Sequence, residues 1–184
     1  MTIGGREYQI NANKSKKQGC FIEILRAIDS NLTAMLSYHC KVFVVQFVVH
    51  CRDYEAKNRG MSNLMRVIKK RLARKYGCLR VAGGWVRETG AGGGGVQHYH
   101  VAVFLDGSRV RWNLGVQVLV NEILEARGYS RPSFRRSHMV RRSDEESIQG
   151  AFYHLSYLAK TRSKSNRLPA TNDYSFSRLK LGKN

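Results

Sequence analysis

A nearly continuous apolar segment at residues 42–49 constrains the fold of this chain more than any other feature. Its sequence is Val-Phe-Val-Val-Gln-Phe-Val-Val, and polar residues bound it on both sides. β-Branched and aromatic residues favour strands, and a strand that is apolar at almost every position is typical of a buried one. The segment therefore predicts a central strand. With 184 residues, 42% of them hydrophobic, the chain suits one domain with its own core.

Hydrophobic periodicity predicts the other elements. Helices are expected over 20–38, 60–76, 111–127 and 144–160, and strands over 78–89 and 97–105, with a glycine-rich turn at 90–95 between them. A loop or edge strand is expected over 129–142. This order predicts a single α+β domain with a central antiparallel sheet flanked by helices. The domain is expected to span 20–165, between a loose basic arm at 1–19 and a basic tail at 166–184.

The charge of the chain points to its partner. The net charge is +19, so a polyanion is the natural partner, and nucleic acid is the expected one. No apolar run approaches the ~20 residues that span a bilayer, and the first residues contain no signal core, so no membrane association is expected. The four cysteines form no Cys-x-x-Cys pair, which predicts free thiols in a reducing cytoplasm. Of these, Cys40 and Cys51 are expected to be small core residues.

Candidate phosphate contacts lie on the predicted helix 60–76, in the segment 129–142 and after the last helix. They are Arg66, Lys69, Lys70, Arg135, Arg136, Arg141, Arg142 and Lys164. On the helix, a solvated face explains the charges as well as a DNA contact does. Phosphate contacts carry no sequence information, so these residues predict no base specificity.

A His-x-His pair lies on the predicted strand 97–105. Alternate side chains of a strand share a face, so His98 and His100 point the same way and Tyr99 points the other way. If the glycine-rich turn closes a hairpin, Glu88 returns beside the two histidines. Two imidazoles and a carboxylate make a three-ligand site for a divalent ion with open positions. The alternative for Glu88 is an exposed charge at a strand end, paired with Arg87.

The last predicted helix has an apolar side and, roughly opposite, a cluster of Tyr153, Tyr157, Lys160 and Lys164. A tyrosine hydroxyl is a poor nucleophile at its ordinary pKa of about 10, so it needs activation by a metal site and a nearby lysine. Attack on a DNA phosphate would give a covalent phosphotyrosine and release a 3′-hydroxyl. Two amphipathic tyrosines packed at a helix edge are the alternative interpretation of the pair.

These motifs resemble those of a known family. The triplet 98–100, followed by an apolar strand, resembles the His-hydrophobic-His motif of HUH endonucleases. Residues 153–160 resemble the Tyr-xxx-Tyr-xx-Lys helix of phage rolling-circle initiators. Together with 85–88 and 155–161, the triplet resembles the gene-two-type replication proteins of filamentous phages (inoviruses), over about residues 40 to 180. The segment 47–50 departs from the family's first motif, because it lacks the hydroxyl residues found there.

The resemblance implies an RNA-recognition-like HUH fold and a rolling-circle replication initiator that nicks and rejoins single-stranded or hairpin origin DNA. It implies Mg²⁺ or Mn²⁺ bound by Glu88, His98 and His100, although such a donor set also takes Zn²⁺. It implies Tyr157 as the nucleophile, with Lys160 beside it, and Tyr153 as the second nucleophile of two-tyrosine members. It places the protein in the cytoplasm of a bacterial host, with no small-molecule substrate. The chain contains no Gly-x-x-x-x-Gly-Lys-Ser/Thr loop, so a host helicase is the expected source of unwinding.

Two other functions fit part of the sequence. A single-tyrosine HUH transposase has similar size and motif order, and it would act on transposon ends rather than on an origin. A non-catalytic nucleic-acid-binding module would account for the charge but leave the histidine pair unexplained.

Overall fold

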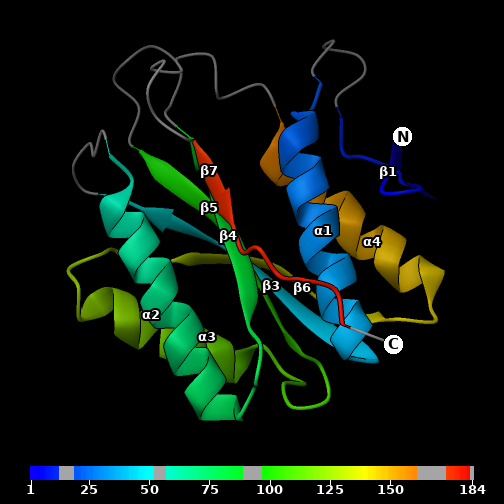
Figure 1. Ribbon diagram of the computed structural model, residues 1–184. Helices are drawn as coiled ribbons and strands as arrows, with labels where there is room; N and C mark the ends of the chain where they lie inside the picture. Colours follow the sequence, from blue (N-terminus) through cyan, green and yellow to red (C-terminus); the bar gives the residue numbers. More distant parts are fainter. Residues whose placement is uncertain (13–18, 52–56, 89–96, 161–172, 183–184) are drawn as a thin grey trace.

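A five-stranded antiparallel sheet with strand order β6-β3-β5-β4-β7 lies at the centre of the protein (Figure 1). The strands are β3 (Lys41–His50), β4 (Ala82–Glu88), β5 (His98–Asp106), β6 (Ser133–Arg141) and β7 (Tyr174–Phe176). The computed structural model describes residues 1–12, 19–51, 57–88, 97–160 and 173–182. The predicted class is confirmed: the described chain is one α+β domain with an antiparallel sheet and helices packed against it.

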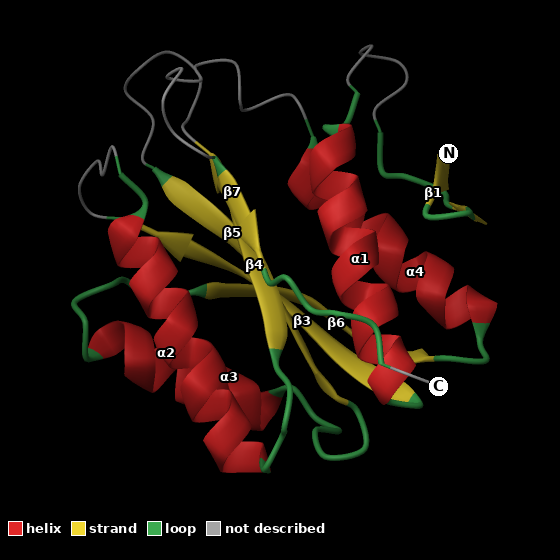
Figure 2. Ribbon diagram, viewed as in Figure 1, coloured by secondary structure: helices red, strands yellow, loops and turns green. Residues whose placement is uncertain are grey.

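Helices cover both faces of the sheet. Figures 1 and 2 show α1 (Ile22–Tyr38) and α4 (Glu145–Leu155) against one face, and α2 (Arg59–Tyr76) and α3 (Leu114–Glu125) against the other. The sheet therefore separates two hydrophobic cores. Because both faces are covered, neither is open for nucleic acid to lie flat across it.

Strand β3 is the central strand that its sequence predicts. Every residue from 42 to 49 is buried, and the strand pairs with β5 on one side and β6 on the other. Its side chains alternate between the two cores. Val42 and Val44 pack toward α1 and α4, whereas Phe43 and Val45 pack toward α2 and α3. An apolar residue at almost every position is what a strand between two helical layers requires.

Several predicted boundaries shift. The helix expected over 144–160 ends at Leu155 and continues as a 3₁₀ turn, η2 (Ser156–Ala159). The strand expected over 78–89 begins only at Ala82, and the helix expected over 111–127 is confined to Leu114–Glu125. The segment 129–142 contains an edge strand, which was one of its two predicted forms. The predicted turn at 90–95 lies outside the described residues.

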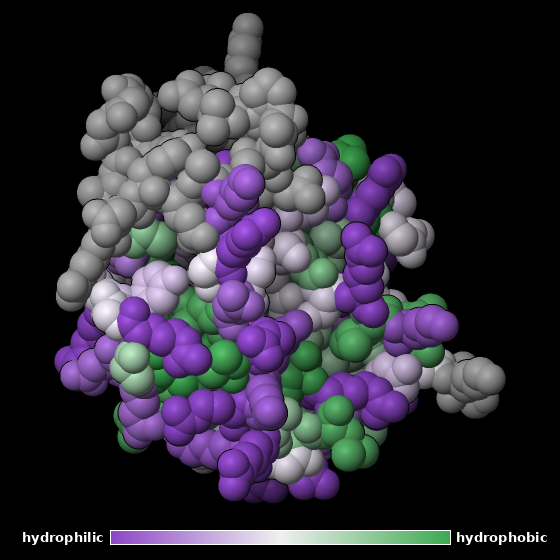
Figure 3. All heavy atoms as spheres, turned by 60° about the vertical axis from the view of Figure 1, so that its left-hand side comes forward, coloured by the Kyte–Doolittle hydropathy of each residue, from purple (hydrophilic) through white to green (hydrophobic). Residues whose placement is uncertain are grey.

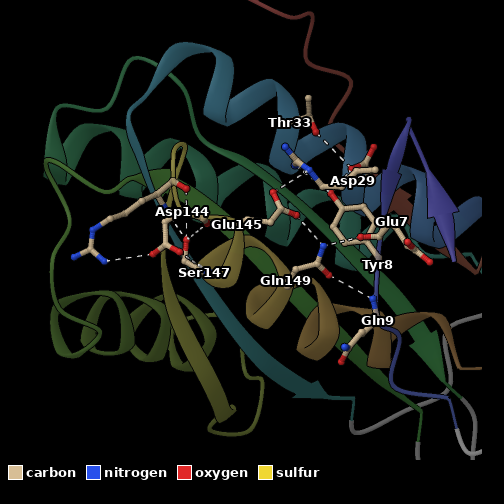
Figure 4. Close-up of polar contacts among 11 residues, drawn as sticks. Glu7, Tyr8, Gln9, Asp29, Thr33, Asp144, Glu145, Ser147 and Gln149 are labelled. Carbon is tan, nitrogen blue, oxygen red and sulfur yellow. Dashed lines mark hydrogen bonds and ion pairs between the residues drawn. The ribbon is translucent and has the colours of Figure 1, made fainter.

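The first twelve residues are not a loose arm, so that prediction is wrong for them. Strands β1 (Thr2–Ile3) and β2 (Arg6–Glu7) form a small hairpin, and Tyr8 is buried against the Phe152 ring at a centroid distance of 3.7 Å. Figure 4 shows the Tyr8 hydroxyl donating to Asp29 of α1, at 2.7 Å. Burial and the Asp29 contact raise the pKa of Tyr8. Local periodicity does not predict this packing, because single buried side chains, and not a repeating apolar pattern, hold the segment against the helices.

The end of the chain is also more ordered than a simple basic tail. Strand β7 pairs with β4 at the sheet edge. The Arg87 guanidinium, on β4, donates to the Asp173 carboxylate at 2.6 Å, and both side chains are buried. Ser177 continues the attachment, because its backbone N–H donates to the Gly83 carbonyl at 2.9 Å. These contacts hold the C-terminal segment against the strand that ends in Glu88.

The cysteines and helices bear on two further expectations. All four cysteines are thiols rather than disulfides, as predicted. Cys40 is exposed, however, so its expected place in the core is wrong, whereas Cys51 is half-buried. Among the described helices, none combines the length and apolar character needed to cross a membrane.

Gly84 tests the docking of β7. A Cβ atom at this position would overlap the Phe176 ring, which lies across from Gly84 in the β4–β7 ladder. Gly84→Ala is therefore expected to lower the free energy of unfolding by about 1–3 kcal/mol through overpacking. Urea unfolding monitored by circular dichroism measures the change.

The matched control is Gly150→Ala in α4, where a Cβ meets no atom within 4 Å. This variant is expected to gain up to about 1 kcal/mol, because alanine is the better helix former. Equal stability of Gly84→Ala and wild type would contradict the packing of Phe176 on β4.

Candidate metal centre

Glu88, His98 and His100 lie together where β4 ends and β5 begins. Glu88 is paired with His98 in the β4–β5 ladder, and His100 follows two residues later on the same face. The Glu88 Oε2 atom lies 3.3 Å from His98 Nε2 and 3.1 Å from His100 Nε2. Glu88 is only 6% exposed and His100 only 8%. The predicted return of Glu88 to the histidine pair is confirmed.

The donor set of this group fits a divalent cation. One ligand atom from each of the three residues lies within 4.8 Å of the other two, so one ion can reach all three. Imidazole nitrogens suit Zn²⁺ and its neighbours, and a carboxylate suits Mg²⁺ and Mn²⁺, so the donors by themselves do not choose the metal. The His98 side chain is 24% exposed, which leaves one side of the group accessible.

Tyr99 fixes which way the strand faces. Its ring is fully buried in the core on the other side of the sheet, as predicted, and stands edge-on to Trp85. Its hydroxyl donates to Asn58 Oδ1 at 2.7 Å and accepts from Gln97 Nε2 at 2.6 Å. Because neighbouring residues of a strand point to opposite faces, this anchoring commits His98 and His100 to the other side.

A third histidine lies beside the group and was not singled out from the sequence. His50, at the end of β3, pairs across the ladder with His98, and their ring centroids lie 5.7 Å apart. Burial, and then the neighbouring His98, lower the pKa of His50, so its ring is neutral at neutral pH. Its place at the end of the apolar strand was visible in the sequence, but the β3–β5 register was not.

Tyr157 is the tyrosine that contacts the group. It lies on η2, half-buried, with its ring centroid 5.4 Å from that of His100 at an interplanar angle of 66°. The Lys160 Nζ atom lies 4.7 Å from the centre of the Tyr157 ring. The structure therefore brings together a tyrosine, a lysine and the possible metal ligands. The helix pattern predicted the tyrosine and lysine cluster, and the histidine pair predicted the ligands.

Tyr153 is in a different place. It is 39% exposed and lines a surface depression with Met1, Tyr8 and Gln149, away from His100. An α-helix turns by ~100° per residue and a 3₁₀ helix by ~120°, so the change to η2 alters where Tyr157 points relative to Tyr153. The continuous helix expected from the sequence put both tyrosines on one side.

The predicted phosphate contacts are spread over the molecule. Arg135 and Arg136 on β6 are exposed and line a cavity of about 350 Å³ next to His100 and Tyr157. Arg141 is exposed and lies 4.0 Å from Asp144. Arg142 donates to the carbonyl of Leu36 at 2.6 Å, at the C-terminal end of α1. Lys164 lies outside the described residues.

The basic side of α2 belongs to the layer opposite the candidate metal centre. Arg66 and Lys70 are exposed there, and Figure 3 shows hydrophilic side chains over much of the face that this layer presents. Lys69 is half-buried and donates to the Ser177 hydroxyl at 3.1 Å, and burial lowers the pKa of Lys69. A ligand bound at the candidate metal centre would have to pass around the sheet edge to touch α2.

Comparisons of the chain with protein-family models, with curated proteins and with solved structures give no match. The fold and the site therefore define the class: an antiparallel α+β protein with a candidate metal-binding Glu-His-His group.

Metal binding is testable without any assumption about catalysis. Mn²⁺ at a hundred times its dissociation constant is expected to stabilise the fold by about 2.7 kcal/mol. Thermal melts with Mn²⁺ and with EDTA measure the difference. Glu88→Gln keeps the shape of the side chain but removes its charge, so most of the shift should disappear.

Glu146→Gln, on the exposed first turn of α4, is the matched control and should keep the full shift. A Glu88→Gln variant that Mn²⁺ stabilises as strongly as wild type would remove Glu88 from the ligand set.

Proposed function

We propose that this protein is a metal-dependent endonuclease that nicks and rejoins single-stranded origin DNA, as the initiator of rolling-circle replication. The observation that carries the proposal is the contact of Tyr157 with His100, a member of the Glu-His-His group. A tyrosine next to possible metal ligands is the arrangement that a covalent strand transfer needs. The net charge of +19 supports a nucleic-acid substrate, and the resemblance to phage initiators supports the choice of reaction.

Glu88, His98 and His100 are the residues that would hold Mg²⁺ or Mn²⁺. The bound cation would polarise the scissile phosphate and offset the charge that develops on it. Burial of Glu88 and His100 supports this role, because electrostatic interactions are stronger where water is excluded. The exposed side of His98 leaves room for a phosphate to approach.

Tyr157 is the proposed nucleophile. Its hydroxyl oxygen loses its proton and attacks phosphorus, the bond from phosphorus to the 3′-oxygen breaks, and one proton in turn reaches the leaving oxygen, which becomes a 3′-hydroxyl. The 5′-phosphate stays joined to Tyr157, so attack by a 3′-hydroxyl reverses the step and rejoins the strand without ATP. The Lys160 ammonium, 4.7 Å from the ring centre, would offset the negative charge that develops on the reacting oxygens. The freed 3′-hydroxyl is the primer, and a host helicase is expected to unwind the duplex.

The exposure of Tyr153 and its separation from His100 support a single nucleophile. A second tyrosine could act only after the DNA or the end of α4 had moved. Tyr153 therefore provides a matched control for Tyr157, four residues earlier in the chain.

The covalent adduct is the direct test. Wild-type protein with Mn²⁺ and a pool of single-stranded oligonucleotides is expected to give a band on a denaturing gel that carries a 3′-end label but not a 5′-end label. Tyr157→Phe should abolish this band, because phenylalanine has no nucleophilic oxygen, while binding to DNA remains. Tyr153→Phe should give the band at the wild-type level.

An adduct that persists in Tyr157→Phe and is lost in Tyr153→Phe would transfer the nucleophile to Tyr153. If wild type forms no adduct with single-stranded or hairpin pools, the endonuclease proposal is rejected and a non-catalytic binding module remains. Adducts on transposon ends instead of replication origins would favour the transposase.

The histidines give an independent test of the same proposal. His98→Ala and His100→Ala are each expected to abolish metal-dependent cleavage while binding persists, since phosphate contacts elsewhere supply most of the affinity. His39→Ala is the control, because His39 lies beside Asp106 at the other end of β5. Cleavage at the wild-type rate in either of the first two variants would contradict the assigned ligands.

A further inference from the structure

The cavity next to Tyr157 has features that the cleavage step does not use. It measures about 350 Å³ and lies between β3, β6, the end of α4 and η2. The residues that matter for its chemistry are Gln46, His100, Arg135, Arg136, His154 and Tyr157. Two of them, His100 and Tyr157, also belong to the candidate metal centre, so a ligand in the cavity would lie against the reacting groups.

Gln46 has a buried amide nitrogen, Nε2, without a hydrogen-bond partner among the described residues. The residue is 7% exposed. The β3–β6 register shifts between Val45 and Phe47, so Gln46 lies at an irregularity of the ladder. It is the one polar residue in the apolar run 42–49. Buried polar groups are nearly always hydrogen-bonded, and an exception that lines a cavity points to a ligand.

His154 adds a second such atom. Its Nδ1 is buried and has no partner among the described residues. Its ring stacks on His138 of β6, with centroids 4.9 Å apart and an interplanar angle of 21°.

 The stacking holds the His154 ring in place. Burial, and then His154, lower the pKa of His138 to about 4, so the pair carries no charge from His138 at neutral pH.

The remaining lining residues indicate the chemical class of the ligand. Arg135 and Arg136 are exposed cations suited to a phosphate, and no acidic residue lines the cavity among those described. An amide and an imidazole can hydrogen-bond the edge of a heterocyclic base. The volume is at the low end of the ~300–1,000 Å³ range of small-ligand sites, which suits one nucleotide and is too small for a duplex.

We propose that this cavity holds one unstacked nucleotide of the bound DNA strand, next to the scissile phosphate, and that Gln46 selects its base. The inference rests on the proposed function, because it assumes that the scissile phosphate lies at Tyr157 and that the DNA strand enters the cavity from there. Arg135 and Arg136 hold the backbone, and the Gln46 amide contacts the base edge. The other DNA contacts would be to phosphates, which carry no sequence information. The site therefore adds a preference for one base at one position of the target.

The experiment measures binding in EDTA, so that no cleavage is needed. A library of single-stranded oligonucleotides of random sequence is selected on wild-type protein and on Gln46→Leu, and the bound pools are sequenced. Wild type is expected to prefer one base at one position, and Gln46→Leu to lose that preference. On the selected sequence, Gln46→Leu should bind about tenfold more weakly, as the loss of one hydrogen bond produces.

Thermal melts of the same variant separate recognition from folding. Leucine has nearly the same size and removes a buried polar atom without a partner, so Gln46→Leu should melt at or above the wild-type temperature. Gln46→Glu is the second variant; its carboxylate should repel the strand and weaken binding if leucine is not tolerated. Arg135→Gln is the control, and it should weaken binding to all sequences alike and reduce the salt dependence.

The outcomes distinguish this inference from the proposed function. Unchanged base preference in both Gln46 variants, with a normal covalent adduct, overturns the nucleotide site and leaves the endonuclease intact. A base preference that depends on Gln46, in a protein that forms no adduct, supports the nucleotide site and rejects the endonuclease. Competition by free nucleoside 5′-monophosphates, without any preference in the library, would show a site for free nucleotides and overturn the inference.

Discussion

Glu88 and His98 face each other across the β4–β5 ladder, and the candidate metal centre depends on that register. A strand has a side-chain period of two, so a slip by one residue would turn His98 and His100 into the opposite core and expose Tyr99 on the site face. Several features oppose such a slip. The Tyr99 hydroxyl is fixed between Asn58 and Gln97, and β5 is bounded on its other side by the buried strand β3.

The same sheet connects the candidate metal centre to segments near the two termini. Side chains alternate along β4, so Arg87 lies on the face opposite Glu88. The ion pair of Arg87 with Asp173 attaches the C-terminal segment there. At the other end of the chain, Tyr8 packs on Phe152 of α4, the helix that leads into Tyr157. Segments from both ends therefore support the elements that carry the site, although neither end contributes one of the candidate ligands.

The change from α4 to η2 separates two tyrosines that the sequence presents as equivalent. Tyr157 lies against His100, whereas Tyr153 faces a depression near the N-terminus. Periodicity could place both on one side only by assuming that the helix continues to Lys160. The break after Leu155 depends on packing, since Ser156, Leu158 and Ala159 are all buried. Local propensity does not contain that information.

Alternation and periodicity are local, so the sequence by itself determined the central strand, the helices on the sheet and the shared face of His98 and His100. Charge is a sum over the chain, so the net charge of +19 also comes from the sequence, and the polyanionic partner that it predicts is part of the proposal. Only the tertiary structure decided which distant residues meet. Strand register and helix ends determine that His50 lies beside His98 and that Tyr157 lies against His100. They also place at the cavity the Gln46 amide nitrogen, which has no partner among the described residues. Strand register and helix ends are set by packing between segments that lie far apart in the chain. No local sequence pattern contains that packing.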